Sequence, residues 1–164
     1  MRQVICAAPS LDISAFATQL AKGSSLVTDP SRALCARYGY QTLYEVPREL
    51  QKRLRRELIR GHAEKLQQNA GAVFDHSIFL FLADWMRWLW GETPSEEWES
   101  VLIEALPAVD RSEKIHHVVA APRAGYDGYR WLDTRNAQQV EKIVRGLYRE
   151  YGCEKRVVEV DLTK

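Results

Sequence analysis

V-I-C-A-A-P-S-L-D-I-S-A, residues 4–15, joins a short apolar run to the beginning of a helix. The apolar run, residues 4–8, predicts a buried strand. Asp12 is a favourable helix N-cap, and Gly23 marks the end of a helix that extends to about Lys22. A short buried strand followed directly by a helix is typical of α/β domains.

The rest of the chain continues this alternation. Further strands are predicted at residues 25–28, 71–75, 115–121 and 157–160, and further helices at 29–39, 47–69, 78–90, from about 93 onward, and at 136–151. Short strands that alternate with helices favour a parallel sheet with helices on both faces, and right-handed crossovers then give a doubly wound fold. We therefore expect one domain over residues 1–164, a three-layer α/β/α structure with a mostly parallel five-stranded sheet.

Composition and charge exclude several classes of protein. The 164 residues carry a net charge of +1, with 46% hydrophobic and 27% charged residues, so we expect no nucleic-acid partner. The longest apolar stretch, residues 72–90, contains Asp75, Asp84 and Arg87, which argues against a membrane span. The N-terminus lacks a secretory signal, which predicts a cytoplasmic location. The three cysteines lie far apart, so we expect no disulfide and no metal site. We also expect no cofactor.

Four segments carry a family resemblance. They are residues 4–20 (strand, phosphate loop and first helix), 27–34 (V-T-D-P-S-R-A-L, for a second strand and an E-x-x-R helix), 72–77 (A-V-F-D-H-S, for a third strand ending in D-R-S) and 125–130 (G-Y-D-G-Y-R, for a Y-D-G-x-R segment before a lid). In this order they resemble the P-loop nucleoside and nucleotide kinases, the nicotinamide riboside kinase-like domains in particular. The resemblance covers nearly the whole chain and implies a P-loop kinase-like fold.

The phosphate-binding loop departs from that family at every defining position. In the motif G-x-x-x-x-G-K-[ST], Ala8 and Ile13 stand for the glycines, Ser14 for the lysine and Ala15 for the magnesium ligand. A β-branched residue does not readily take the positive φ often needed in such loops. Asp12 adds a carboxylate where polyphosphate would lie. We therefore expect weak or absent nucleotide binding and no catalytic residues.

The resemblance also implies an acceptor pocket made by Asp29, Arg32, Asp75, His76 and Asp127. Parallel sheets bind ligands beyond the carboxyl ends of their strands, and Asp29 and Asp75 both follow predicted strands. The alternative interpretation is structural: the aspartates cap helices or form a turn, Arg32 is solvated and His76 is a surface histidine.

An active enzyme would assign further roles within this frame. Asp75 would be the general base, and Arg130 and Arg135, together with Arg123, would clamp the phosphates. Without a functional phosphate loop, these arginines would instead pair with acids. His116 and His117 are neighbours in a predicted strand and face opposite sides of it, so they are expected to be structural.

Two helices carry candidate protein interfaces. Phe81, Trp85 and Trp88 belong to an aromatic helix that is apolar on most sides, and Trp is enriched at interface centres. Arg53 and Arg56 belong to the densely basic helix at residues 47–69. The alternatives are core packing for the aromatic side chains and a solvated face, paired with Glu49, Glu57 and Glu64, for the basic ones.

The leading interpretation is a catalytically inactive P-loop kinase-like domain that acts as a protein-binding, regulatory or assembly subunit, bacterial on the resemblance alone. A protein partner is expected, and a homo-oligomer is compatible with this function. The alternative is a small-molecule kinase with an atypical phosphate-binding loop. A third interpretation is a domain that binds a nucleoside or nucleotide in the acceptor pocket without chemistry.

Overall fold

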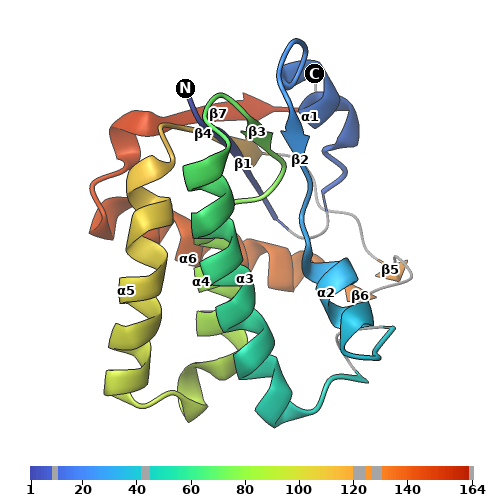
Figure 1. The fold of residues 1–164 in the computed structure, drawn as a ribbon, viewed down its shortest axis with the longest axis vertical. Helices are drawn as coiled ribbons and strands as arrows, with labels where there is room; N and C mark the ends of the chain where they lie inside the picture. The colour runs from blue at the N-terminus through green and yellow to red at the C-terminus, as the bar shows by residue number, and fades with distance from the viewer. Residues whose placement is uncertain (9–10, 42–44, 120–124, 127–130, 163–164) are drawn as a thin grey trace.

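The sheet is the centre of the fold in a computed structural model, which describes residues 1–8, 11–41, 45–119, 125–126 and 131–162. Five strands pair in parallel in the order β2-β3-β1-β4-β7 (Figure 1). Their bounds are β1 (Gln3–Ala7), β2 (Leu26–Val27), β3 (Val73–Phe74), β4 (Lys114–Val119) and β7 (Val157–Asp161). The predicted parallel five-stranded sheet is therefore confirmed.

The helices follow the predicted order. They are α1 (Ser14–Leu20), α2 (Ser31–Arg37), α3 (Arg48–Gln68), α4 (Ile78–Leu89), α5 (Ser95–Arg111) and α6 (Thr134–Glu150), with short 3-10 turns η2 (Trp90–Glu92) and η3 (Glu154–Arg156). The sequence did not predict an antiparallel hairpin formed by β5 (Gly125–Tyr126) and β6 (Trp131–Leu132). This hairpin lies between β4 and α6 along the chain.

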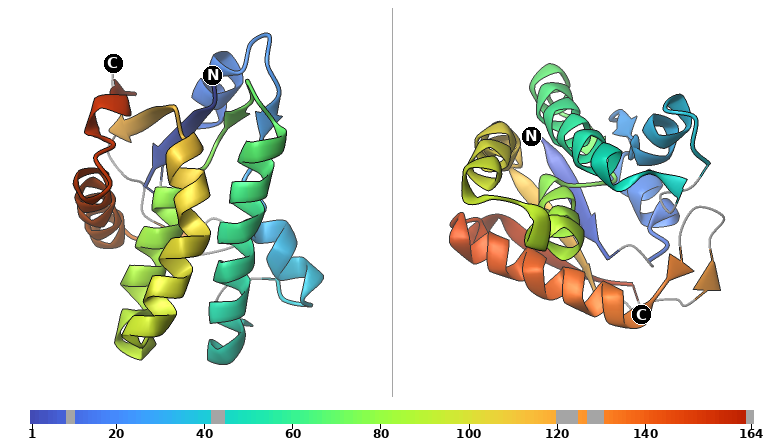
Figure 2. Two further views of the ribbon diagram at one scale, coloured as in Figure 1. Left: turned by 60° about the vertical axis from the view of Figure 1, so that its left-hand side comes forward. Right: turned by 90° about the horizontal axis from the view of Figure 1, so that it is seen from below.

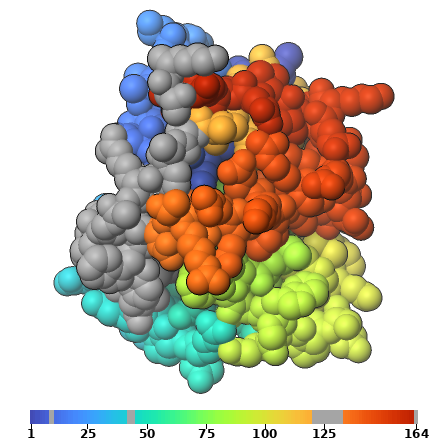
Figure 3. Space-filling view, turned by 180° about the vertical axis from the view of Figure 1, so that it is seen from behind, coloured from blue at the N-terminus to red at the C-terminus, as the bar shows by residue number. Residues whose placement is uncertain are grey.

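The two faces of the sheet are covered unequally, which completes the three layers. Alternate side chains of β1 point to opposite faces, as a strand requires. Val4 and Cys6 face a large core that includes residues of α3, α4, α5 and α6, whereas Ile5 packs in a smaller cluster with α1. Helices α3, α4 and α5 run side by side away from the sheet (Figures 1 and 2), and α6 crosses the back of the molecule (Figure 3).

Helix α4 is apolar on most sides because it is the central helix of the larger layer. It contacts α3, α5 and α6 at once, as the view from below in Figure 2 shows. Phe81 and Trp85 are 8% and 0% exposed, so the expectation that they form a protein interface is wrong. The Trp85 indole N–H donates to Thr93 Oγ1 at 3.0 Å, which satisfies its one polar atom within the core. Of the three predicted interface aromatics, Trp88 alone is exposed, at 42%.

The basic side chains of α3 form ion pairs across helices rather than along α3. Lys52 Nζ lies 2.6 Å from Glu97, and Arg56 and Arg60 both bind Glu104. These acids belong to α5, so the basic row joins α3 to α5. Arg56 is thereby half-buried against α5, whereas Arg53 is exposed, with its guanidinium 5.7 Å from the Tyr38 ring centroid.

Several smaller expectations concern single side chains. All three cysteines are free and buried. His116 Nε2 lies 2.8 Å from Gln3 Oε1 on the α1 side, and His117 Nδ1 lies 3.1 Å from the Tyr148 hydroxyl on the α6 side. The two histidines thus face opposite sides of the sheet. Within the described residues, no helix combines the length and hydropathy that a bilayer crossing requires.

Candidate functional site

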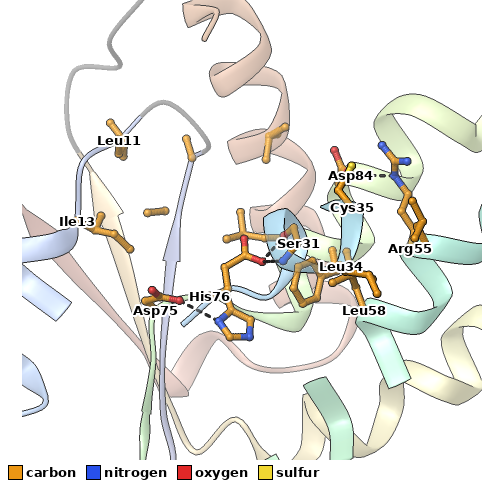
Figure 4. Close-up of a pocket in the computed structure, with 17 residues that line it drawn as sticks. Leu11, Ile13, Ser31, Leu34, Cys35, Arg55, Leu58, Asp75, His76 and Asp84 are labelled. Atoms are coloured by element: carbon orange, nitrogen blue, oxygen red, sulfur yellow. Dashed lines mark hydrogen bonds and ion pairs between the residues drawn. The ribbon is translucent and has the colours of Figure 1, made fainter. Parts of the chain in front are cut away.

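A cavity of about 250 Å³ opens beyond the carboxyl ends of β1, β2 and β3. Its polar lining residues come from four different parts of the chain: Asp29 and Ser31, Arg55, Asp75 and His76, and Asp84. Figure 4 shows Leu11 and Ile13 on one side, Arg55 and Asp84 on the opposite side, and Asp75, His76 and Ser31 between them. This is the edge of a parallel sheet at which ligands are expected.

The side of the cavity next to the start of α1 is apolar among the described residues. Ala8, Leu11 and Ile13 line the cavity there, and the Leu11 N–H donates to the Ala8 carbonyl at 3.0 Å. Ile13 has φ −111°, an ordinary value for a β-branched residue. Asp12 Oδ1 accepts the Ser14 N–H at 3.1 Å, so the carboxylate occupies a donor at the start of α1. Ser14 and Ala15 are exposed and do not line the cavity.

Asp75 and His76 form a pair at the end of β3. Their Oδ1 and Nδ1 atoms lie 3.0 Å apart. His76 is 2% exposed, so the alternative of a surface histidine is wrong. His76 precedes Ser77, which caps α4 by accepting the Leu80 N–H, and the His76 ring is buried because it packs against His62 of α3.

A second histidine lies behind this pair. His62 of α3 is fully buried, and its ring centroid is 4.7 Å from that of His76. The rings of Phe74 and Phe81 complete an aromatic cluster around it. Burial holds the pKa of His62 well below its usual value, with a smaller contribution from the nearby His76. Neither ring nitrogen of His62 has a hydrogen-bond partner among the described residues.

Asp29 lies at the start of α2. Its Oδ1 accepts the backbone N–H of Ser31 at 2.8 Å and also binds the Ser31 hydroxyl. These bonds hold the Asp29 carboxylate at the cavity wall. Arg32 is exposed and does not line the cavity.

The expected acceptor set is therefore assembled in part. The structure brings Asp29, Asp75 and His76 into one cavity. Asp127, Arg123 and Arg130 lie outside the described residues. Arg135 is exposed at the start of α6, where its backbone N–H donates to Asp133 Oδ1 at 2.8 Å, and it is not among the lining residues.

Sequence reasoning missed the pair formed by Arg55 and Asp84. Arg55 Nε donates to Asp84 Oδ2 at 2.8 Å, and Arg55 Nη1 donates to Gln51 Oε1 at 3.1 Å. Arg55 is 7% exposed, although it belongs to the basic helix. A signal was present, because Asp84 is the only acid in the apolar helix at residues 78–90. A carboxylate on a helix buried on most sides requires a cation nearby.

The charges of the cavity are unequal. Asp29, Asp75 and Asp84 contribute three carboxylates, and Arg55 is the one lysine or arginine among the described lining residues. This excess favours a ligand that is cationic or rich in hydroxyl donors over an anion such as polyphosphate. Within the described residues, no group of three or more His, Cys, Asp or Glu side chains is placed to hold a metal ion.

Comparison with known proteins identifies the fold. No protein-family model matches the chain. No curated protein matches it either. Among solved structures, a NadR protein in complex with NAD and AMP-PNP is 14% identical, with a TM-score of 0.69 over 98% of this chain and 44% of the other. A NadR protein in complex with NR is 12% identical, with a TM-score of 0.66 over 96% of this chain and 43% of the other.

This chain spans less than half the length of these NadR proteins. The likeness at such low identity concerns the fold, which is of the P-loop kinase-like type.

Proposed function

We propose that this chain is a P-loop kinase-like domain that binds a small organic cation in the cavity and does not transfer phosphate to it. The observation that carries the proposal is the cavity itself. It has two carboxylates, Asp29 and Asp75, at the carboxyl ends of the strands, while the apolar side chains of Leu11 and Ile13 line the side where a phosphate loop would be.

The proposed absence of phosphoryl transfer rests on what the loop side lacks. A phosphate loop needs glycine backbone that wraps the phosphates and a lysine that reaches them. Here Ser14 stands in place of the lysine, and Asp12 occupies the Ser14 N–H. Arg55, the cationic side chain that does line the cavity, is on the opposite side from Ile13 (Figure 4).

The class of ligand follows from the lining. Carboxylates attract a cation and accept hydrogen bonds from hydroxyls, and the apolar side chains of Leu34, Leu58 and Leu80 suit the body of an organic molecule. One of the similar NadR structures contains NR. Nicotinamide riboside, a pyridinium cation with ribose hydroxyls, is therefore the first ligand to test.

The test is thermal unfolding of the purified chain with nicotinamide riboside and, separately, with Mg-ATP. A ligand at about 100 times its dissociation constant adds about 2.7 kcal/mol, which raises Tm by several degrees. We expect nicotinamide riboside to raise Tm and Mg-ATP to leave it unchanged. Asp75→Asn is the matched variant, because it keeps the shape of the side chain and removes its charge. It should weaken the response to nicotinamide riboside.

A second candidate, a small-molecule kinase with an atypical loop, has one observation in its favour. Asp75 follows β3 directly, lines the cavity and is hydrogen-bonded to His76, which suits a general base for an acceptor hydroxyl. Arg130 and Arg135 would then have to bind the phosphates. Formation of ADP and a phosphorylated product, lost in Asp75→Asn, would establish this activity and refute the inactive domain.

The protein-binding role expected from the sequence has narrower support. Phe81 and Trp85 are in the core, so a partner would have to meet Trp88 and the neighbouring Trp90, which are 42% and 51% exposed. The proposal includes a regulatory protein partner, which would bind or release this chain when the ligand binds in the cavity.

A further inference from the structure

Arg55 is a buried guanidinium whose hydrogen bonds are incomplete. Its side chain is 8% exposed. Nε is bonded to Asp84 and Nη1 to Gln51, whereas Nη2 has no hydrogen bond among the described residues. A guanidinium carries five N–H donors, and the bonds to Asp84 and Gln51 use two of them. Arg55 therefore has capacity for another acceptor.

The contact with Asp84 leaves this capacity open. The ion pair uses one oxygen, Oδ2, and one nitrogen, Nε, rather than the two parallel bonds that a guanidinium and a carboxylate can form. Asp84 is 39% exposed, so solvent water also stabilises the charge of its carboxylate. Asp84 thus holds Arg55 in position at the cavity wall without using the Nη2 donors.

Negatively charged side chains line another part of the same cavity. Asp29 and Asp75 each use Oδ1 for a bond to a neighbouring side chain, Ser31 and His76 respectively. Their Oδ2 atoms have no hydrogen bond among the described residues. The cavity therefore has two carboxylates free to meet a cation and, separately, a guanidinium free to meet an anion. Apolar side chains, among them Leu34 and Leu58, lie between them (Figure 4).

We infer that the ligand of this cavity is a zwitterion, with its cationic group at Asp29 and Asp75 and a carboxylate at Arg55. This inference rests on the proposed function, because it assigns a second charged group to the ligand of the same site. A volume of about 250 Å³ suits one compact molecule with an apolar middle.

Two probes that differ in one group test the inference. N-methylnicotinate and N-methylnicotinamide share the pyridinium ring and its positive charge, but the first carries a carboxylate where the second carries a carboxamide. Both are titrated into the full chain and followed by NMR chemical shifts. We expect both to bind, the carboxylate about tenfold more tightly or more, as for a hydrogen bond between charged groups.

Three variants assign the preference to its residues. Arg55→Gln should abolish the preference for the carboxylate, whereas Asp84→Asn, which keeps Arg55 and removes its competing anion, should increase it. Asp75→Asn should weaken both probes by a similar factor. If Arg55→Gln does not fold, as judged by circular dichroism, the carboxylate preference of Asp84→Asn still tests the role of Arg55.

The outcomes separate the two proposals. Equal binding of the two probes to the wild-type chain overturns the zwitterion and leaves the cation-binding function standing. An Asp84→Asn chain that folds and shows no greater preference for the carboxylate also overturns the role of Arg55. Binding of neither probe overturns both proposals.

Discussion

His62 offers the sharpest test of the energetics, because it is a polar side chain in an apolar place. It is fully buried among the rings of Phe74, His76 and Phe81, and neither ring nitrogen has a partner among the described residues. A buried polar group without a hydrogen bond costs about 1–3 kcal/mol. The substitution His62→Phe removes both nitrogens and keeps a ring of similar size.

We expect His62→Phe to raise the free energy of unfolding at pH 7.5 by about 1–3 kcal/mol, less any cost of fitting the slightly larger ring. For a chain of this length, each 1 kcal/mol corresponds to a Tm change of about 2–4 °C.

The pH dependence gives a second, independent measure. Burial lowers the pKa of His62 in the folded chain, so below about pH 6.5 the unfolded chain binds a proton that the folded chain does not. The contribution of neutral His62 to stability is therefore complete above the unfolded pKa and is lost as the pH falls. Between pH 7.5 and 5.0 this one proton is worth about 2 kcal/mol. The wild-type chain should lose this amount relative to His62→Phe.

Urea denaturation at pH 7.5, 6.0 and 5.0 measures both quantities. His116→Phe is the matched control, because it removes a histidine that is bonded to Gln3 and should therefore bring no gain in stability. The reasoning would be refuted by a His62→Phe chain that is less stable at pH 7.5 and keeps the wild-type pH profile. That result would mean that the His62 ring has a partner, such as a buried water.

Three further predictions concern other parts of the fold. Arg156→Ala should lower the free energy of unfolding by about 1–3 kcal/mol, because Arg156 Nη1 donates to the carbonyls of Val109 and Ser112 at the end of α5, at 2.9 Å each. Arg149→Ala is the control, because Arg149 is an exposed arginine. Glu104→Gln should cost about 1 kcal/mol in urea denaturation, with a smaller loss in 1 M NaCl, because one carboxylate pairs with two arginines of α3. Burial raises the pKa of Cys6 to about 11, and all three cysteines are buried. They should therefore resist a thiol reagent in the folded chain and all react in urea. Rapid reaction of Cys6 in the folded chain would contradict its burial.

The sequence was sufficient for the element order and for part of the site. Apolar runs of strand length and helix-end residues such as Asp12 and Gly23 are local signals. They placed each helix and each strand of the five-stranded sheet within a few residues of its bounds. Asp29 and Asp75 could be assigned to one site because the carboxyl ends of parallel strands share an edge of the sheet. The absence of a G-x-x-x-x-G-K-[ST] motif was also evident from the sequence alone.

The errors arose where one pattern is compatible with two environments. A helix that is apolar on most sides can be central in a core or can present an interface, and the sequence of α4 does not distinguish them. Its position between three other helices buries Phe81 and Trp85. In the same way, the sequence of α3 is compatible with a solvated face or an interface, and it does not show that Glu104 of α5 pairs with Arg56.

The sequence by itself determined a doubly wound parallel fold, because the signals for its strands and helices depend on residues close together in the chain. It also shows that the chain has no G-x-x-x-x-G-K-[ST] motif. Only the tertiary structure decided which side chains line the cavity. Arg55 and Asp84 are 29 positions apart and meet because α3 packs against α4, and His76 is buried because α3 covers it. Such contacts depend on how helices pack, and the pattern of any single segment does not contain that information.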